Sequence, residues 1–437
     1  MTTRTDDPPS RLGLPLILFA VLLVGLVNLG ELAGWNAMLL QGRLADADGY
    51  LRLVRVLELR QGSPWFEDLT MRLAPPEGLV NQWTRPLDIL ILLPALALER
   101  IAGLSPPDAL FVVGIAISPV LHVAAALAAA WGAQAIWPGR APWYAVLFMA
   151  GAPAAATYSA LGRPDHHALI ILLLAIGLGA VLRAVLPTGG ARSAIVAGMA
   201  FGAGLWAGPE ALIVIAPALL ALGIIAIIAE DGTPVAAQGR RLCLALAATV
   251  LVALLAEHRP AEWLVAEFDR ISLPQLCLAL LAAACFAVAE RCGAAPRWRR
   301  AAMCGAAAVA AIAVLVLLFP GVLRGPLANA DEAYLRLLHP SIQENLPLPP
   351  FGPGSLSDLG SFLGGAVFAG LLAIAIAMPG WRRDGTWPAG LLLLIVLLAG
   401  LGATLGARRF GMDLAPPAAI AAAGLVGLLL NGRRMRG

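Results

Sequence analysis

Two histidines and an aspartate stand at the edge of a long apolar run, in the stretch "YSALGRPDHHALIILLLAIGLG". Pro164 and Asp165 look like the start of a helix, so one interpretation makes Asp165 an N-cap. Asp165 and His167 are two positions apart, and such residues project to the same side of extended or loop backbone. A carboxylate and an imidazole at this spacing form half of a site for a divalent metal. His166 is then expected to point elsewhere, into packing or toward lipid headgroups.

A second acidic group opens the stretch "GRLADADGYLRLVRVLELRQGSPWF", which contains Asp46 and Asp48. The apolar residues that follow Tyr50 recur at helical spacing, which predicts an amphipathic helix along the membrane surface. Asp48 stands at the start of this helix, where the N-terminus favours an anion. Asp48 is therefore either an N-cap or a residue of the same polar site.

Two further polar clusters lie in the second half of the chain. In "ADEAYLRLLHPSIQENLPLPPFGPG" the prolines and glycines predict a mobile loop, and Glu344 is either a solvated acid or a site residue. In "GARRFGMDLAPPAAIAAAGL" Arg408 and Arg409 are either headgroup anchors or, if they face a cavity, ligands for phosphate. Glu210, in "LWAGPEAL", is a helix cap or, like Arg408, a candidate cavity-lining residue.

The composition shows which elements must position these residues. The chain has 437 residues, of which 60% are hydrophobic and only 13% charged. Apolar runs of about 20 residues, the length that crosses a bilayer, recur along the whole chain. We therefore predict an all-α polytopic membrane protein whose residues 1–437 form one transmembrane domain. The net charge of +3 does not indicate a nucleic-acid partner, and the five cysteines show no C-x-x-C spacing that would indicate zinc or a disulfide framework.

The apolar runs predict twelve full crossings. They are Leu12–Gly34, Ala109–Trp131, Trp143–Ala160, His166–Leu186, Ala194–Ala207, Ala211–Ala229, Leu242–Ala256, Leu273–Ala289, Ala301–Val322, Leu359–Met378, Ala389–Leu405 and Leu414–Leu430. A further run, Leu87–Leu104, is interpreted as a re-entrant or surface helix. If it crossed the bilayer instead, the count would be thirteen and the N-terminus would lie outside.

Arginine placement orients the predicted spans in a plasma or inner membrane. Loops rich in arginine alternate along the chain and fall on one side, which the positive-inside rule makes cytoplasmic together with both termini. Three polar segments then lie on the external or periplasmic side: residues 35–86 with surface helices, the short loop of Asp165, and the mobile loop 323–358. A charge at mid-bilayer costs roughly 2.5–3.5 kcal/mol, so acids gathered near one face with histidine and arginine indicate a hydrated cavity for a cation and an anionic ligand.

Four motifs, in order and at similar spacing, resemble those of the catalytic subunit of oligosaccharyltransferases, which have the GT-C glycosyltransferase fold. "DADGYLRLVR" is similar to the first-loop motif and matches Asp48. "LGRPDHHALI" is similar to the Gly-x-x-Asp-x-(Glu or His) motif and matches Asp165 and His167. "SIQENLPLPP" resembles the mobile-loop motif at Glu344, and "ARRFGMDLAPP" resembles the segment whose arginine holds the donor pyrophosphate, here Arg409. The resemblance covers nearly the whole chain.

This resemblance implies a metal-dependent, inverting glycosyltransferase. Its donor would be a sugar or oligosaccharide on polyprenyl phosphate or diphosphate, with membrane lipids around it. Asp48, Asp165 and His167 would bind Mn²⁺ or Mg²⁺, and Arg409 would bind the donor phosphate. Asp48 would also activate the acceptor, and Glu344 would complete the catalytic site when the long loop closes.

One departure from the family concerns the acceptor. Oligosaccharyltransferases continue into a soluble domain with a Trp-Trp-Asp-Tyr-Gly motif, whereas this chain ends at Gly437, soon after the last predicted span, without that motif. The acceptor is therefore left open among protein, lipid and polysaccharide. A transporter or flippase of a lipid-linked substrate, or an inactive family member that serves as an assembly partner, are the alternatives, and metal dependence separates the enzyme from the transporter.

Overall fold

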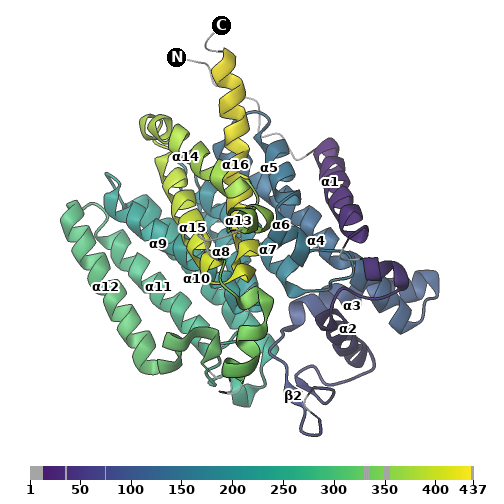
Figure 1. Cartoon of the computed structure of the whole chain (residues 1–437). Helices are drawn as coiled ribbons and strands as arrows, with labels where there is room; N and C mark the ends of the chain where they lie inside the picture. The colour runs from purple at the N-terminus through teal and green to yellow at the C-terminus, as the bar shows by residue number, and fades with distance from the viewer. Residues whose placement is uncertain are drawn as a thin grey trace.

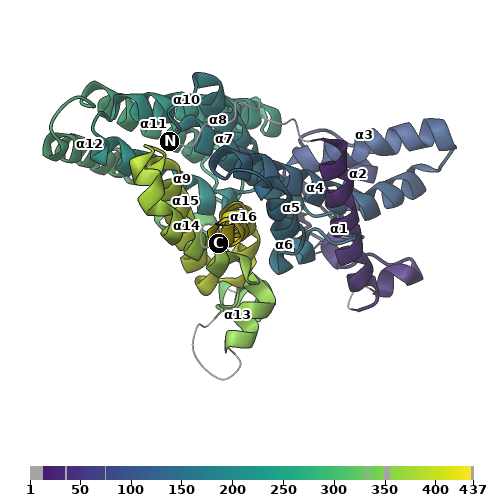
Figure 2. The same ribbon diagram turned by 90° about the horizontal axis from the view of Figure 1, so that it is seen from above.

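The computed structural model describes residues 13–34, 37–73, 75–328, 330, 332, 334–348 and 355–434. Within these residues, ten helices are long and apolar enough to cross a membrane, by length and composition. They are α1 (Leu14–Leu32), α4 (Pro106–Ile136), α7 (His166–Ala184), α9 (Leu212–Ile228), α10 (Thr233–Glu257), α11 (Leu273–Arg291), α12 (Arg297–Leu318), α14 (Ala366–Arg383), α15 (Trp387–Gly406) and α16 (Gly411–Arg434). Figures 1 and 2 show them as one bundle, with α1 toward one lateral side and α12 on the opposite side. The predicted all-α membrane fold is confirmed.

Two predicted spans form shorter apolar helices. One is α8 (Ala191–Ala207). The other, predicted as the continuous span Trp143–Ala160, is wrong in that form: it divides into α5 (Ala141–Ala150) and α6 (Pro153–Tyr158). Ala152 between them is extended because a residue before proline is pushed out of the helical region.

The predicted span Leu359–Met378 is also interrupted. It divides into α13 (Ser355–Leu363) and α14, which starts at Ala366. Gly364 between them has φ +66°, a left-handed conformation that glycine adopts without the penalty of a Cβ and that commonly ends a helix.

The first polar segment folds into a small unit against the bundle. It contains η1 (Ala37–Gln41), α2 (Ala47–Arg60) and a two-stranded antiparallel ribbon of β1 (Leu69–Thr70) and β2 (Leu79–Val80). The run Leu87–Leu104 forms α3 (Arg85–Ala102), which is not among the ten long apolar helices and contains a fully buried aspartate, Asp88. Figures 1 and 2 show α2 and α3 side by side at the edge of the bundle.

The second long polar segment consists of short turns. These are η4 (Pro320–Leu327), the π-turn η5 (Tyr334–Leu338), η6 (His339–Ser341) and η7 (Gln343–Asn345); the remaining short elements are η2 (Pro209–Ala211), η3 (Pro260–Glu262) and η8 (Arg408–Phe410). Part of the loop predicted over 323–358, including residues 349–354, lies outside the described residues.

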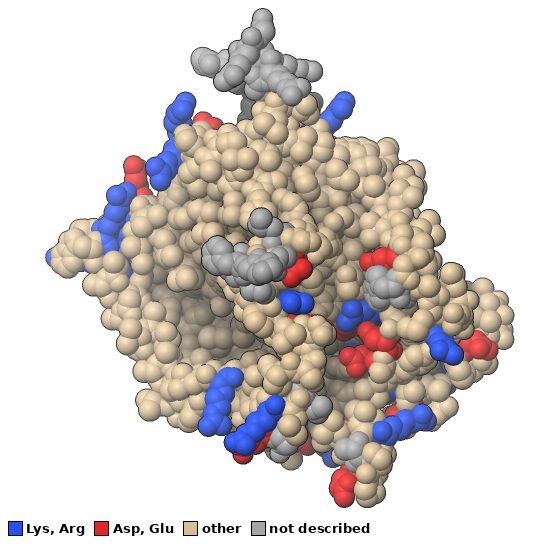
Figure 3. Space-filling model, viewed as in Figure 1, with Lys and Arg blue, Asp and Glu red and all other residues tan. Residues whose placement is uncertain are grey.

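From α7 onward the helices alternate in direction, so one set of connections lies at the same end of the bundle. Asp165 before α7, Glu210 before α9 and Arg409 before α16 all belong to this end, which we call the site end. The last turns of α1 also lie there, because Asn28 accepts a hydrogen bond from Leu161 N at 2.8 Å. Figure 3 shows charged side chains near the top and across the lower part of one face, with a wide uncharged band and a hollow between them. The N-terminal arginines Arg4 and Arg11 lie outside the described residues.

Close packing around α7 holds three helices of the bundle together. At Gly132 of α4, a Cβ would come within 3.3 Å of Gly179 Cα of α7 and 2.7 Å of Ile420 Cδ1 of α16. Because protein interiors are close-packed, there is no room for a larger residue without displacement of a neighbour. The three helices that carry Asp165, Arg409 and the α4 wall are therefore in direct contact.

Candidate active site

The segment that carries Asp165 is anchored at three points. Leu161 N donates to the Asn28 side chain of α1, and Gly162 N donates to Ile115 O of α4 at 3.0 Å. Gly162 O in turn accepts from Ala45 N of the first polar segment at 3.0 Å. Gly162 has φ +74°, which favours glycine here. These bonds fix the approach to α7 and thereby the position of Asp165.

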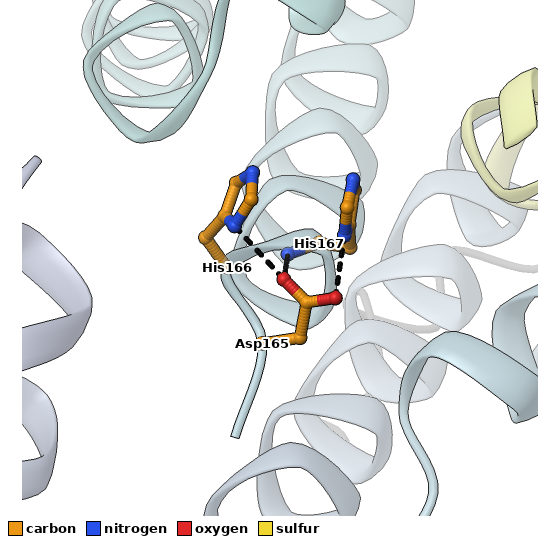
Figure 4. A group of neighbouring side chains, drawn as sticks. All are labelled: Asp165, His166 and His167. Carbon is orange, nitrogen blue, oxygen red and sulfur yellow. Dashed lines mark hydrogen bonds and ion pairs between the residues drawn. The ribbon is translucent and has the colours of Figure 1, made fainter. Parts of the chain in front are cut away.

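Asp165 holds both neighbouring histidines (Figure 4). His166 Nδ1 lies 2.8 Å from Asp165 Oδ1, and His167 Nδ1 lies 2.8 Å from Asp165 Oδ2. The two imidazole rings stack with their centroids 4.3 Å apart. Ligand atoms of all three residues lie within 4.8 Å of one another, which makes them a candidate metal group.

The expectation that His166 points away from this group is wrong. Asp165 caps α7 and accepts from His167 N at 3.4 Å, so its carboxylate lies over the first turn of the helix. Consecutive residues at a helix start diverge by about 100°, but a carboxylate with two oxygens reaches both imidazoles from the cap position. The N-cap interpretation and the site interpretation of Asp165 are thus compatible.

Glu210 reaches the same group from another connection. Its Oε1 lies 3.3 Å from His166 Nε2, 3.4 Å from His167 Nε2 and 3.7 Å from Arg409 Nη2. No capping hydrogen bond of the Glu210 side chain is found for the short turn η2. The carboxylate is nearly buried, and its contacts are with His166, His167 and Arg409.

Arg409 contacts the same oxygen of Glu210 from a third connection, η8. Its Nη1 donates to Asn345 Oδ1 at 3.5 Å, while its buried Nε has no hydrogen-bond partner among the described residues. A guanidinium with an unused donor suits an anionic oxygen. Arg408 differs, because its Nε donates to Pro347 O at 3.3 Å and so contacts the second long polar segment.

The first polar segment brings two acids, Asp46 and Asp48, to the edge of this polar group, which we call the rim. Asp46, not Asp48, caps α2 and accepts from Gly49 N at 2.8 Å, so the N-cap interpretation of Asp48 is wrong. Asp48 is exposed in the first turn, with a carboxylate free of capping. The pKa of the Asp48 carboxyl is raised, mainly because the group is partly desolvated. The negative charges of Asp46, Asp165 and Glu344 raise it further.

An arginine joins the rim to the histidine group. Arg163 Nε lies 3.1 Å from Asp46 Oδ2 and 3.6 Å from Asp165 Oδ2. Burial alone would raise the pKa of Asp165, but the adjacent imidazoles hold it well below its usual value. Asp165 is therefore ionised, which a ligand for a cation requires.

Glu344 contacts the site through a tyrosine. Its Oε2 accepts a 2.8 Å hydrogen bond from Tyr158 OH, and the Tyr158 ring lies 4.9 Å from the His167 ring. Glu344 thus lies beside the group although 177 positions separate it from His167 in the sequence.

Sequence reasoning missed one acid of the site end. Asp413, one helical turn after Arg409 in α16, is fully buried, and neither carboxylate oxygen has a hydrogen-bond partner among the described residues. Its charge interacts with those of Glu210, His167 and Arg409. The available signal was an acid directly before a predicted span, where a charge is costly unless it faces a cavity or a partner.

Together, the fold and this polar group define a class of protein: a helical, polytopic membrane protein with ionisable side chains gathered at one end of its bundle. No protein-family model matches the chain, and no curated protein sequence matches it. The likeness is found among solved structures.

The apo crystal structure of the Archaeoglobus fulgidus oligosaccharyltransferase is similar, with a TM-score of 0.72, 19% identity and coverage of 97% of this chain and 51% of that chain. The archaeal oligosaccharyltransferase AglB from the same organism, in complex with an inhibitory peptide and a dolichol-phosphate, gives a TM-score of 0.72 at 17% identity with the same coverage. A third structure, in complex with Zn and sulfate, gives 0.66 at 19% identity and covers 96% of this chain and 50% of that one. This chain spans about half the length of those proteins, and the similarity shows the shared fold.

Proposed function

We propose that this protein is a metal-dependent membrane glycosyltransferase that transfers a sugar or oligosaccharide from a polyprenyl phosphate or diphosphate. The carrying observation is the convergence of Asp165, His166, His167, Glu210 and Arg409, from three separate connections, at one end of a GT-C bundle. Such a group places ligands for a cation next to a donor for an anion. A lipid-linked sugar phosphate needs both.

The residues fit a divalent cation with nitrogen and oxygen ligands. His167 Nε2 is buried and makes no hydrogen bond among the described residues, although Glu210 Oε1 lies 3.4 Å away, so its deprotonated form can ligate a cation. Two imidazoles favour Mn²⁺ over Mg²⁺, since Mg²⁺ prefers oxygen ligands and retains water. The similar structure with Zn and sulfate supports a cation and an anion in this fold. Asp165, His167 and Asp48 would hold the ion, with His166 and Glu210 beside them.

Different residues of the chain would then perform the separate steps of the transfer. A nucleophilic group of the acceptor would attack the anomeric carbon from the face opposite the phosphate, and its proton would pass to the Asp48 carboxylate. The bond between the anomeric carbon and the phosphate oxygen breaks, and its electrons stay on the polyprenyl phosphate, where Arg409 donates to the developing charge. The chemistry of a bound cation is to offset the negative charge of the leaving phosphate.

Glu344 would complete this arrangement from the second long polar segment. Its hydrogen bond to Tyr158 holds it beside His167. Movement of this segment would admit the donor and its return would exclude water, as loop closure does in other enzymes.

We place the site on the external or periplasmic face of a plasma or inner membrane, with both ends of the chain in the cytoplasm. The short connections at the end opposite the site carry arginines, including Arg183, Arg240 and Arg382, and the positive-inside rule makes such connections cytoplasmic. The similar structure that contains dolichol-phosphate supports a lipid-linked donor. No contact described here favours a transporter or a flippase.

Mass spectrometry of lipid-linked sugars and envelope glycans in a deletion strain tests the proposal. We expect one lipid-linked saccharide to accumulate and one decoration to disappear, and the intact gene to reverse both. Asp165→Asn should fail to restore the decoration, whereas the exposed acid at the other end of the bundle, in Asp384→Asn, should restore it. If no lipid-linked saccharide accumulates, or if Asp165→Asn restores the decoration fully, the proposal is wrong.

A further inference from the structure

An apolar pocket of about 480 Å³ lies between α1 and α4, and no residue of η8 or α16, the elements at Arg409, lines it. Its walls are formed by Val21, Val24, Gly25, Asn28, Leu29, Pro119, Val120, Val123 and Leu161. Val21, Leu29 and Val120 are more than half exposed, so the pocket opens toward the surface that the two spans present to lipid. Its size falls in the range of ordinary small-molecule sites.

The pocket offers nothing to a polar ligand. Asn28 is its one polar side chain, and both ends of that amide are occupied: Nδ2 donates to Val24 O at 2.9 Å and Oδ1 accepts from Leu161 N. A hydrocarbon chain is therefore the occupant that suits these walls.

The turn at Leu161 and Gly162 joins the pocket to the candidate active site. Leu161 lines the pocket, and Arg163, two residues further along the chain, contacts Asp46 and Asp165. Two residues span at most about 7 Å. A headgroup at the end of a chain in this pocket would therefore meet the acidic rim of the site.

The charges where the pocket meets the candidate active site, which we call its mouth, determine which headgroup can bind there. Asp46 and Asp48 lie on one side, and Glu31 of α1, one turn beyond Asn28, has a buried Oε2 without a hydrogen-bond partner among the described residues. Arg163 is already paired with two carboxylates. These acids repel a phosphate, whereas the donor phosphate is attracted to Arg409 on the other side.

We infer that the α1–α4 pocket seats the apolar chain of the acceptor, a membrane lipid with an uncharged, hydroxyl-bearing headgroup. This rests on the proposed function and names its acceptor class. The hydroxyl would lie near Asp48, the group that takes its proton, while the polyprenyl donor enters from the Arg409 side. The site would then join two lipid-borne substrates from opposite faces.

Photolabelling of the purified full chain in lipid nanodiscs tests this inference. The probe is a diacylglycerol glycoside with a diazirine in its acyl chain, and the comparison probes are phosphatidylglycerol and polyprenyl phosphate with the same group. We expect the glycoside to label α1 and α4 peptides well above the lipid-exposed α12, and the two anionic probes to show no such preference. Preferential labelling of α1 and α4 by polyprenyl phosphate would assign the pocket to the donor and overturn the inference.

Two glycines of α1 provide a matched pair of variants. A Cβ at Gly25, inside the pocket, or at Gly30, outside it, meets no atom within 4 Å, so neither substitution creates a backbone clash. Gly25→Phe should fill the pocket and lower labelling by the glycoside about tenfold, the effect of about two methylene groups withdrawn from apolar contact. Gly30→Phe should leave the labelling unchanged.

Equal labelling of the two variants would reject the acceptor pocket. Labelling requires no turnover, so this outcome is separate from a failure of the proposed function, which the deletion strain reports. If the strain accumulates its lipid-linked saccharide while Gly25→Phe labels normally, only the acceptor assignment falls. If Gly25→Phe does not fold, the wild-type preference among the three probes still decides the question.

Discussion

At the scale of single residues, the polar group shows how one carboxylate organises several partners. Asp165 caps α7 with one hydrogen bond and holds two imidazoles with its two oxygens. Their outer nitrogens then converge on Glu210 from a different connection. Asp165 thus positions His166 and His167 together, and the two histidines should behave as a pair.

The pairing leads to an expectation for metal affinity. We expect His166→Gln to weaken Mn²⁺ binding by about 10- to 100-fold, the usual effect of a residue that ligates or orients a ligand. Titration of the purified protein with Mn²⁺, followed by electron paramagnetic resonance, measures this directly. His122→Gln is the control, because His122 is a buried histidine that contacts Met149 O in the body of the bundle. Unchanged Mn²⁺ affinity in His166→Gln would show that, of the two histidines, only His167 contributes to metal binding.

At the scale of elements, α2 and α3 are joined by a buried charge network. Asp88 is completely buried and accepts from Arg52 and Arg55 of α2 at 2.8 Å and from Arg85 at 3.2 Å. Arg52 also lies over the Trp83 ring, at 4.2 Å, and that ring lies 6.3 Å from the His166 ring. The network therefore supports α2, which carries Asp48, and one wall of the histidine group.

Loss of the central charge should destabilise this pair of helices. Asp88→Asn leaves buried guanidinium groups without their counter-charge, and we expect a loss of about 3–5 kcal/mol in the free energy of unfolding. The matched control is Glu99→Gln, which breaks an exposed pair with Arg60 between the same helices and should cost less than about 1 kcal/mol. Chemical denaturation in detergent gives both values. Similar losses in the free energy of unfolding for the two variants would contradict the claim that burial makes the Asp88 network important for stability.

The same network predicts a pH dependence of stability. Burial alone would raise the pKa of Asp88, but Arg52 and Arg55 hold it below its usual value. The folded pKa is thus lower than the unfolded one, so the stabilisation is present at neutral pH and is lost as the pH falls through the folded pKa. We expect the wild type to lose more stability than Asp88→Asn between about pH 5 and pH 3. Parallel pH profiles of the two melting temperatures would contradict this.

At the scale of the whole molecule, the bundle has two distinct ends. Connections that carry the acids and histidines gather at the site end, while arginine-rich connections such as residues 382–385 lie at the other. The pocket is lined by α1, α4 and Leu161, whereas Arg409 lies on η8, a separate element that also contacts the site. This division suits a reaction between two membrane-borne molecules, with charge directing each to its own side.

Reporter fusions test the orientation of these ends. We expect alkaline phosphatase, which folds with disulfides only in an oxidising compartment, to be active when fused after Trp263 at the site end. A fusion after Gly385, in the turn between α14 and α15, should be inactive, and green fluorescent protein should give the reverse pattern. Activity of phosphatase at Gly385 would place the site in the cytoplasm.

Periodicity and composition alone determined the class of this protein and the approximate places of its spans, because hydrocarbon thickness imposes the length of an apolar helix. They also singled out Asp165, Glu344 and Arg409, because an ionisable group beside a bilayer is energetically costly unless it binds a ligand or a partner. Only the tertiary structure decided that His166 and Glu210 join the group, that Asp46 rather than Asp48 caps α2, and that Asp413 is buried beside Arg409. These facts depend on contacts between connections far apart in sequence, and helical periodicity carries no information about which connections meet.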